Sequence, residues 1–192
     1  MCETLAVDGM IRFRYAAWAA SRAVRGFKSK VGLKVLKTCP GLVAVAGSID
    51  KLPHPDDFDK QHADWRSTII GESRESGAEV TAGVAAKLIN VYLKTLCLAL
   101  WSDDNPINTE LKSKLGRVHP PVDRILLTKL RDSESNNDRR NDWTRLRDLG
   151  WTRFTDAQYE DAIKLIDARL AVDGDSGKRW RIEKHWSPGN DE

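Results

Sequence analysis

The chain is poor in cysteine, and this limits the kinds of site that it can hold. Its 192 residues include three cysteines, Cys2, Cys39 and Cys97, which lie far apart and form no Cys-x-x-Cys pair. This spacing argues against a structural zinc site, an iron–sulfur cluster and a disulfide framework. Unpaired cysteines are typical of a reducing compartment. We therefore expect a cytoplasmic protein that needs no metal and no cofactor.

The chain also lacks a long uninterrupted apolar run. Its longest apolar-rich stretch, Leu88 to Trp101, is interrupted by Asn90 and Lys94 and is too short to cross a bilayer. Its start, Met1-Cys2-Glu3-Thr4, does not show the basic and then apolar layout of a secretory signal. Hydrophobic residues make up 41% of the chain and charged residues 31%, which is typical of a globular protein. The length predicts a single soluble domain, residues 1–192.

Acidic residues are absent between Asp8 and Asp50. The same stretch carries a block of basic residues: Arg12, Arg14, Arg22, Arg25, Lys28, Lys30, Lys34 and Lys37. Such a block attracts a phosphate backbone, so it predicts contact with nucleic acid. The side chains expected to make this contact are Arg12, Arg14, Arg22, Arg25, Lys28 and Lys30. Two other interpretations stay open. The block can be an ordinary solvated basic face, or a transit peptide, against which Glu3 and Asp8 argue.

Internal repeats and low-complexity tracts are absent, whereas helical spacing of apolar residues recurs. The pattern predicts an all-α, compact helical domain with basic N-terminal helices (9–49), a central core (59–131) and C-terminal helices with a tail (143–192). Helices are expected over residues 10–26, 28–38, 59–74, 84–101, near 111, over 122–131 and 143–149, and after Thr155. Residues 42–50 fit a strand or a helix, 133–142 a mobile loop, and 179–186 a short strand or a docked tail.

The predicted helix from Val84 is apolar on most sides but carries three polar side chains. Lys87, Asn90 and Lys94 follow one another at spacings of three and four, so they lie on one stripe. Lysine is seldom buried without a partner. The stripe therefore predicts either a functional cleft or a solvated edge from which the lysines reach out to water.

A second polar feature precedes the next helix, where the sequence reads His119-Pro120-Pro121-Val122-Asp123. The two prolines fix the backbone before a carboxylate at a helix start, and a negative charge is favoured there by the helix dipole. A structural helix cap explains Asp123 equally well. His119 is expected to bond to a phosphate or to cap its own turn.

Together the two features resemble the helix-hairpin-helix superfamily of DNA glycosylases, in particular the 8-oxoguanine glycosylases and their archaeal relatives. The matching residues are Gly83-Val84-Ala85-Ala86-Lys87 and Pro121-Val122-Asp123, and Lys94 falls where the archaeal branch has a second lysine. The resemblance covers residues 83–131, with weaker support from 59–74. The family's Leu-Pro-Gly-Val-Gly hairpin is replaced here by Ser76 to Gly83, and Ser102 to Arg117 is an insertion.

The resemblance implies a DNA glycosylase with β-lyase activity that flips a modified, 8-oxoguanine-like base out of duplex DNA. Lys87 is then the nucleophile that forms a Schiff base, and Asp123 assists the proton transfers. Substrate-binding candidates are Asn90, Lys94, His119 and Trp101. Stacking candidates are Trp101, Trp143, Trp151 and Tyr92, although each of these rings also suits the core.

Other functions fit parts of the same sequence. A non-catalytic DNA- or RNA-binding module would use residues 9–49. A helical interaction protein, such as a toxin, an antitoxin or a phage-defence component, would keep Lys87 and Asp123 far apart. A ribonuclease that uses His119 has less support, because no second histidine lies at a telling spacing.

Overall fold

The computed structural model describes residues 6–24, 29–75, 77, 79–100 and 107–187, and all regular elements within these ranges are helices. The prediction of an all-α fold is thereby confirmed. The α-helices are α1 (Val7–Ala23), α2 (Ser29–Lys37), α3 (Pro40–Gly47), α4 (Phe58–Glu75), α5 (Ala82–Cys97), α6 (Thr109–Arg117), α7 (Arg124–Asp132), α8 (Asn137–Leu149) and α9 (Asp156–Val172). The 3₁₀ helices are η1 (Ile49–Lys51), η2 (Leu98–Leu100), η3 (Trp151–Arg153) and η4 (Arg179–His185).

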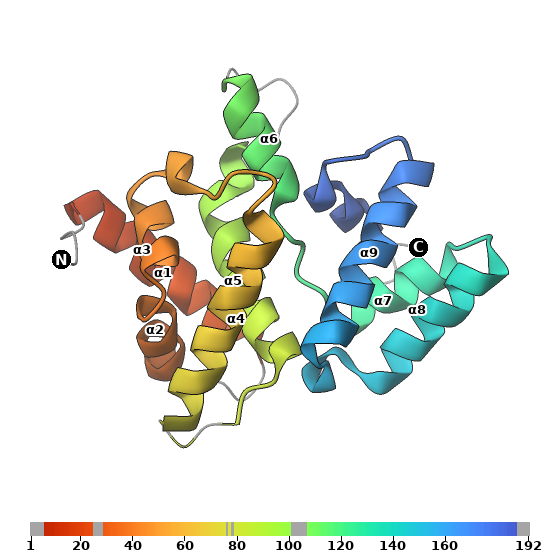
Figure 1. Ribbon diagram of the computed structural model, residues 1–192, viewed down its shortest axis with the longest axis horizontal. Coiled ribbons are helices and arrows are strands. Elements are labelled where there is room, and N and C mark those ends of the chain that lie inside the picture. The colour runs from red at the N-terminus through yellow and green to blue at the C-terminus, as the bar shows by residue number, and fades with distance from the viewer. Residues whose placement is uncertain (1–5, 25–28, 76, 78, 101–106, 188–192) are drawn as a thin grey trace.

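The helices form two groups that lie side by side (Figure 1). The first group contains α1 to α5, the second contains α7 to α9, and α6 stands at the top between them. Each group has its own cluster of buried apolar side chains. Helix α5 contributes to both clusters, since Leu88 and Ile89 belong to the first and Ala86 to the second. A helix that is apolar on most sides is thus explained by burial between two groups.

The start of α5 is fixed by its contacts with η3. The Thr81 side chain caps the helix by accepting a hydrogen bond from the Val84 amide, and its hydroxyl donates to the Thr152 carbonyl at 2.7 Å. The Gly83 amide donates to the Phe154 carbonyl at 3.2 Å. A Cβ atom on Gly83 would lie 1.8 Å from the Trp151 carbonyl oxygen. Only glycine therefore lets η3 approach α5 this closely.

The segment Ala82–Leu100 corrects the expectation that the apolar stretches are too short to span a membrane. Its 19 residues have a mean hydropathy of 1.5, so by length and composition they can cross a bilayer. However, 56% of this segment is buried inside the protein. The core helix of a globular protein has the same properties, so this is weak evidence for a membrane span.

Three local predictions are corrected or decided by the structure. Residues 42–50, which fitted a strand or a helix, lie mostly in α3, which begins at Pro40. Residues 133–142 are not a mobile loop, because α8 begins at Asn137 with Asn136 as its cap, and the buried Glu134 carboxylate accepts hydrogen bonds from Arg139. The segment 179–186 is not a strand, since it forms η4 and packs Ile182 into the second cluster.

Helix α1 buries a narrow side made of small residues. Phe13, Ala16, Ala17 and Ala20 are in the core, and the small alanines let α1 lie close to its neighbours. The apolar stripe of Ile11, Tyr15 and Trp18 lies on the other side, with 60%, 62% and 48% of these residues exposed. The largest side chains of α1 therefore face solvent.

Candidate functional site

The structure brings Lys87 and Asp123 together, although 35 residues separate them in the chain. The Lys87 amine donates a 2.8 Å hydrogen bond to Oδ2 of Asp123 and forms an ion pair with it. Lys87 is only 6% exposed. It lies in the middle of α5, and the preceding loop places Asp123 at the N-terminus of α7. A buried lysine is expected to have a carboxylate partner, and here the partner is the predicted one.

The Asp123 carboxylate is held by three donors. Its Oδ1 accepts a 2.9 Å bond from the Leu126 amide, so Asp123 is the N-cap of α7. Its Oδ2 accepts the Lys87 amine and, at 3.2 Å, the indole N–H of Trp186. One oxygen of Asp123 therefore caps the helix, as one interpretation of the sequence expected, and the other oxygen faces the lysine.

An aromatic ring covers the Lys87 amine from another side. The nitrogen lies 5.1 Å from the centroid of the Trp151 ring, a distance at which a cation is attracted to the ring face. Trp151 is the first residue of η3, and its carbonyl is the group that Gly83 allows to approach α5. The glycine four residues before Lys87 thus sets where this ring lies.

The pair opens into a cavity of about 440 Å³, within the range of about 300–1,000 Å³ that is typical of ligand pockets. Its walls come from α1, α5, η2, η4 and the loop before α7, and they include Tyr15, Lys87, Lys94, Asp123, Glu183 and Trp186. The cavity therefore lies where the two groups of helices meet.

A second lysine and a second carboxylate line the same cavity. Lys94, two turns after Lys87 on α5, forms an ion pair with Glu183 of η4. Burial raises the pKa of the Glu183 carboxyl, and the nearby Lys94 opposes that shift. The other carboxylate oxygen of Glu183, Oε1, is buried and has no hydrogen-bond partner among the described residues. The ion pair with Lys94 therefore satisfies only one of the two oxygens of this carboxylate.

Sequence reasoning did not single out Glu183, Trp186 or Tyr15 as site residues. A signal was present in the tail, where a glutamate stands between the apolar Ile182 and the pair His185-Trp186. Apart from Ile182, the rest of the segment 179–186 is basic and aromatic, so its single acidic residue is a candidate for pairing with a cation. Tyr15 gave no such signal, because its position beside the cavity depends on how α1 packs against α5.

Asn90 lies on the predicted stripe but away from the cavity, in a buried polar network. Its amide group donates to the Pro120 carbonyl at 2.8 Å and to the Tyr159 hydroxyl at 2.9 Å. Its carbonyl oxygen accepts from Nε2 of His62 at 2.8 Å. Asn90 is fully buried, so the prediction of direct substrate contact is corrected to a positioning role. It fixes the loop that carries Asp123 by holding the backbone at Pro120.

His119 belongs to the same network and does not line the cavity that contains Lys87, but it borders a second cavity between α4 and α9. Its Nδ1 lies 2.9 Å from the Tyr159 hydroxyl and its Nε2 lies 2.8 Å from Oδ1 of Asp59. The contacts of His62 are satisfied by a neutral ring that carries its proton on Nε2. Nε2 of His119 lies close both to Oδ1 of Asp59 and, at 2.6 Å, to the guanidinium of Arg179. Burial lowers the pKa of His62 well below its usual range and that of His119 to about 4, in agreement with neutral rings.

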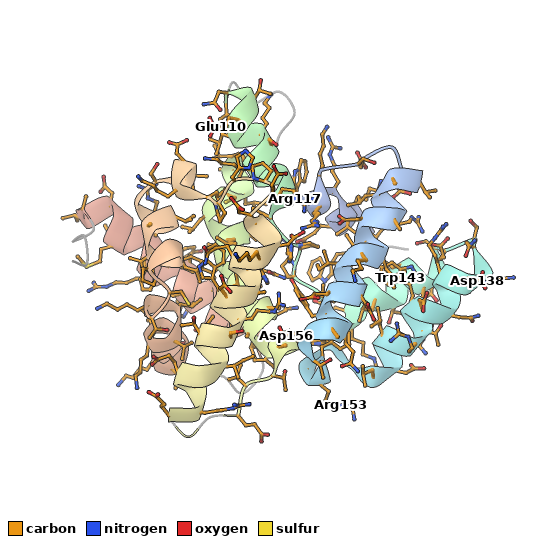
Figure 2. The ribbon with its side chains drawn as sticks, in the orientation of Figure 1. Glu110, Arg117, Asp138, Trp143, Arg153 and Asp156 are labelled. Carbon is orange, nitrogen blue, oxygen red and sulfur yellow. The ribbon has the colours of Figure 1, made fainter. Side chains whose placement is uncertain are left out.

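A second cavity, of about 430 Å³, lies between α4 and α9 and is lined mainly by paired charges. The Arg66 guanidinium of α4 donates to Asp156 of α9 at 2.8 Å, and Arg117 of α6 donates to Asp59 of α4 at 2.6 Å. Figure 2 shows Asp156 and Arg117 at two levels of this seam. The buried Arg179 reaches both Asp59 and Asp167. These pairs join the two groups of helices, and Lys60 and Lys164 also line the cavity, so its basic side chains outnumber its acidic ones.

The predicted nucleic-acid contacts lie on or near α1 and α2. Arg12, Arg14, Arg22 and Lys30 are exposed, and Arg12 also donates to the Gly47 carbonyl at the end of α3. Arg25, Lys28 and Trp101 lie outside the described residues. Of the other stacking candidates, Trp143 and Tyr92 are fully buried in the core, in agreement with the alternative role given for these rings.

The cavity that contains Lys87 thus offers an amine, two carboxylates and aromatic rings at one place. An amine beside a carboxylate can act as a nucleophile whose proton has an acceptor. Among the residues that the structure describes, no group of three or more histidine, cysteine or acidic side chains is arranged to hold a metal ion. Comparisons with models of protein families, with curated proteins and with solved structures found no match to this chain.

Proposed function

We propose that this protein is a DNA glycosylase with β-lyase activity that uses Lys87 as its nucleophile. The observation that supports this most directly is the 2.8 Å contact between Lys87 and Asp123 inside a cavity of ligand size. The motifs that contain the two residues, and the order of these motifs in the chain, are also those by which the sequence resembles the helix-hairpin-helix glycosylases. The substrate is duplex DNA with a modified base that is flipped into the cavity.

In the proposed reaction, Nζ of Lys87 attacks the anomeric carbon of the extruded nucleotide. A bond forms between Nζ and C1′, the glycosidic bond breaks, and the departing base takes the bonding electron pair. Asp123, whose Oδ2 already accepts a hydrogen bond from Lys87, takes one proton from the Lys87 ammonium before the attack and passes it to the departing base. Asp123 then takes a second proton from Nζ and delivers it to O4′ as the C1′–O4′ bond breaks. This opens the sugar ring and leaves a protonated Schiff base between Lys87 and C1′. Loss of a C2′ proton from this imine allows β-elimination of the 3′ phosphate.

The test is covalent trapping with borohydride, which reduces a Schiff base to a stable amine. The full chain is incubated with a panel of duplexes that carry different modified bases, and the cross-linked product is measured. We expect trapping by the unmodified protein and none by Lys87→Ala. Asp123→Asn is expected to lose excision by about 100-fold or more but to retain DNA binding.

Two controls distinguish a loss of the reaction from a loss of folding. Lys164→Ala removes an exposed lysine of α9 that borders the other cavity, and it should trap normally. Lys87→Gln keeps a polar side chain of similar length, and circular dichroism will show whether the variants are folded. Trapping that persists in folded Lys87→Gln would contradict the nucleophile role.

A non-catalytic nucleic-acid-binding protein is the alternative function, and the exposed basic side chains of α1 and α2 favour it. The Lys87–Asp123 pair then only holds α7 on α5. A phage-defence or other interaction protein was expected to keep Lys87 and Asp123 far apart, and their pairing removes that support. The borohydride experiment distinguishes the glycosylase from the non-catalytic protein, because the latter predicts no trapped product with any duplex of the panel.

A further inference from the structure

A stripe of exposed aromatic and basic side chains runs along α1. It consists of Ile11, Arg14, Tyr15, Trp18 and Arg22, and we call it the α1 ridge. The spacings of three and four residues place these side chains on one face of the helix. The rings of Tyr15 and Trp18 lie with their centroids 5.7 Å apart, so they form a joined aromatic surface. Both rings are about half exposed.

The ridge is continuous with the cavity that contains Lys87 and Asp123. Tyr15 is on the ridge and also lines the cavity, and Ala19 and Ala23 of the same helix line it as well. Leu98 and Trp186, on the other walls, are 57% and 37% exposed. If one unit of a polymer enters the cavity, the adjacent units of that polymer therefore lie beside the ridge.

The charge of this region selects an anionic partner. Residues 9–49 contain no acidic side chain, and Arg14 and Arg22 are exposed within the ridge itself. Arginine beside exposed aromatic rings is the combination that binds single-stranded nucleic acid, since the cations contact phosphates and the rings stack on bases. Stacking requires a base whose face is open, and a paired duplex hides both faces of each base.

We propose that the α1 ridge binds unpaired nucleotides that neighbour the one in the cavity. The inference rests on the proposed function, because that function identifies the group in the cavity as a nucleotide. It adds a preference for unpaired over paired DNA. The protein should favour strands in which several bases are unstacked over fully paired duplex. An anionic lipid surface or a second copy of the chain are the other partners that such a ridge can contact, and the experiment includes them as outcomes.

The test measures the affinity of the full chain for three DNAs of one sequence by fluorescence anisotropy. These are a single strand, a fully paired duplex and a duplex with a short unpaired bubble. We expect the single strand and the bubble to bind about tenfold more tightly than the paired duplex. Trp18→Ala and Tyr15→Ala should each remove most of that preference, and they should change binding to the paired duplex little.

A matched control and a charge variant complete the experiment. Val172→Ala truncates an apolar side chain that is 64% exposed on α9, away from the ridge, and should leave the preference unchanged. Arg14→Gln should weaken binding to all three DNAs. It should also reduce the slope of log affinity against log salt concentration by about one, which corresponds to one released counterion. Trp18→Phe, which keeps a ring, should retain most of the preference.

Three results would overturn the inference. The first is equal affinity for the paired and unpaired DNAs. The second is binding to vesicles of anionic lipid that Trp18→Ala abolishes, without any preference among the DNAs. The third is self-association that Trp18→Ala abolishes, again without a preference. Lys87→Ala separates this inference from the proposed function, because it should keep the preference for unpaired DNA even though it traps nothing.

Discussion

The carboxylate of Asp123 joins two kinds of interaction at one residue. Its Oδ1 caps α7, and its Oδ2 neutralises the buried amine of Lys87 and accepts the indole N–H of Trp186. The first interaction concerns the local helix, and the second connects α5, α7 and the C-terminal segment. Substitutions of Asp123 can remove the ion pair and keep the helix cap, because a cap needs only a hydrogen-bond acceptor whereas Lys87 needs a negative charge.

We expect Asp123→Ala to lower the free energy of unfolding by about 3–5 kcal/mol, because it leaves the Lys87 amine buried without a counter-ion. Asp123→Ser should be about 1 kcal/mol more stable than Asp123→Ala, since a serine hydroxyl still caps the helix. Urea unfolding measures both differences. A loss below 1 kcal/mol in Asp123→Ala would mean that the ion pair contributes little.

At the scale of elements, the close approach of η3 to α5 depends on Gly83. The ring of Trp151 lies over Lys87 because the backbone of η3 reaches α5 where no Cβ atom stands in the way. This contact is made between backbones rather than side chains. It therefore tolerates changes in the surrounding apolar residues but not a methyl group on this glycine.

Gly83→Ala is expected to destabilise the protein by about 1–3 kcal/mol, because the added Cβ would overlap the Trp151 carbonyl oxygen and force η3 away. The displacement should also change the fluorescence of Trp151. Gly71→Ala is the matched control. Gly71 is exposed in α4 with nothing within 4 Å of its added Cβ, so the change should stabilise the helix by up to about 1 kcal/mol. Equal thermal shifts in the two variants would contradict the steric explanation.

At the scale of the whole molecule, two neutral histidines are buried where the two groups of helices join. His62 and His119 stay unprotonated in the fold because burial lowers the pKa of both. In the unfolded chain each histidine takes up a proton near pH 6.5. The stability that the neutral rings contribute is therefore complete above about pH 6.5 and is lost as the pH falls toward about 4, the pKa of His119 in the fold.

We expect the free energy of unfolding to fall between about pH 6.5 and 5 with a slope that approaches two protons, or about 2.7 kcal/mol per pH unit. His119→Gln should reduce the slope by about one proton. His54, whose side chain is 61% exposed, supplies the control, since His54→Gln should leave the slope unchanged. Urea unfolding across this pH range measures the slopes, and an unchanged slope in His119→Gln would contradict the assignment.

Much of the helical architecture followed from the sequence because its signals are local. The capping box at Thr155 and Gln158 and the apolar spacing of α4 and α5 each involve residues within one or two turns. The segment 133–142 was mispredicted because its order comes from Glu134, a single acid buried among arginines. Polar composition alone does not distinguish such a network from a loop.

The candidate site was predictable only in part, for a similar reason. Lys87 and Asp123 stand out as a buried lysine and a helix cap, so their types and positions are visible in the sequence. Asn90 and His119 were singled out equally well, but their place in the buried network depends on Tyr159 and His62, which come from other helices. Glu183 and Tyr15 reach the cavity through tertiary packing that no local pattern contains.

The burial of α5 on both of its sides has a mechanical consequence. A helix clamped between two apolar clusters cannot rotate or slide without disrupting both, so the nitrogen of Lys87 occupies a nearly fixed point in space. If the protein is the DNA glycosylase proposed above, an incoming strand must bend and twist until its reactive carbon arrives at that point. The sequences that deform most easily would then be processed fastest, even where the protein touches none of their distinguishing atoms.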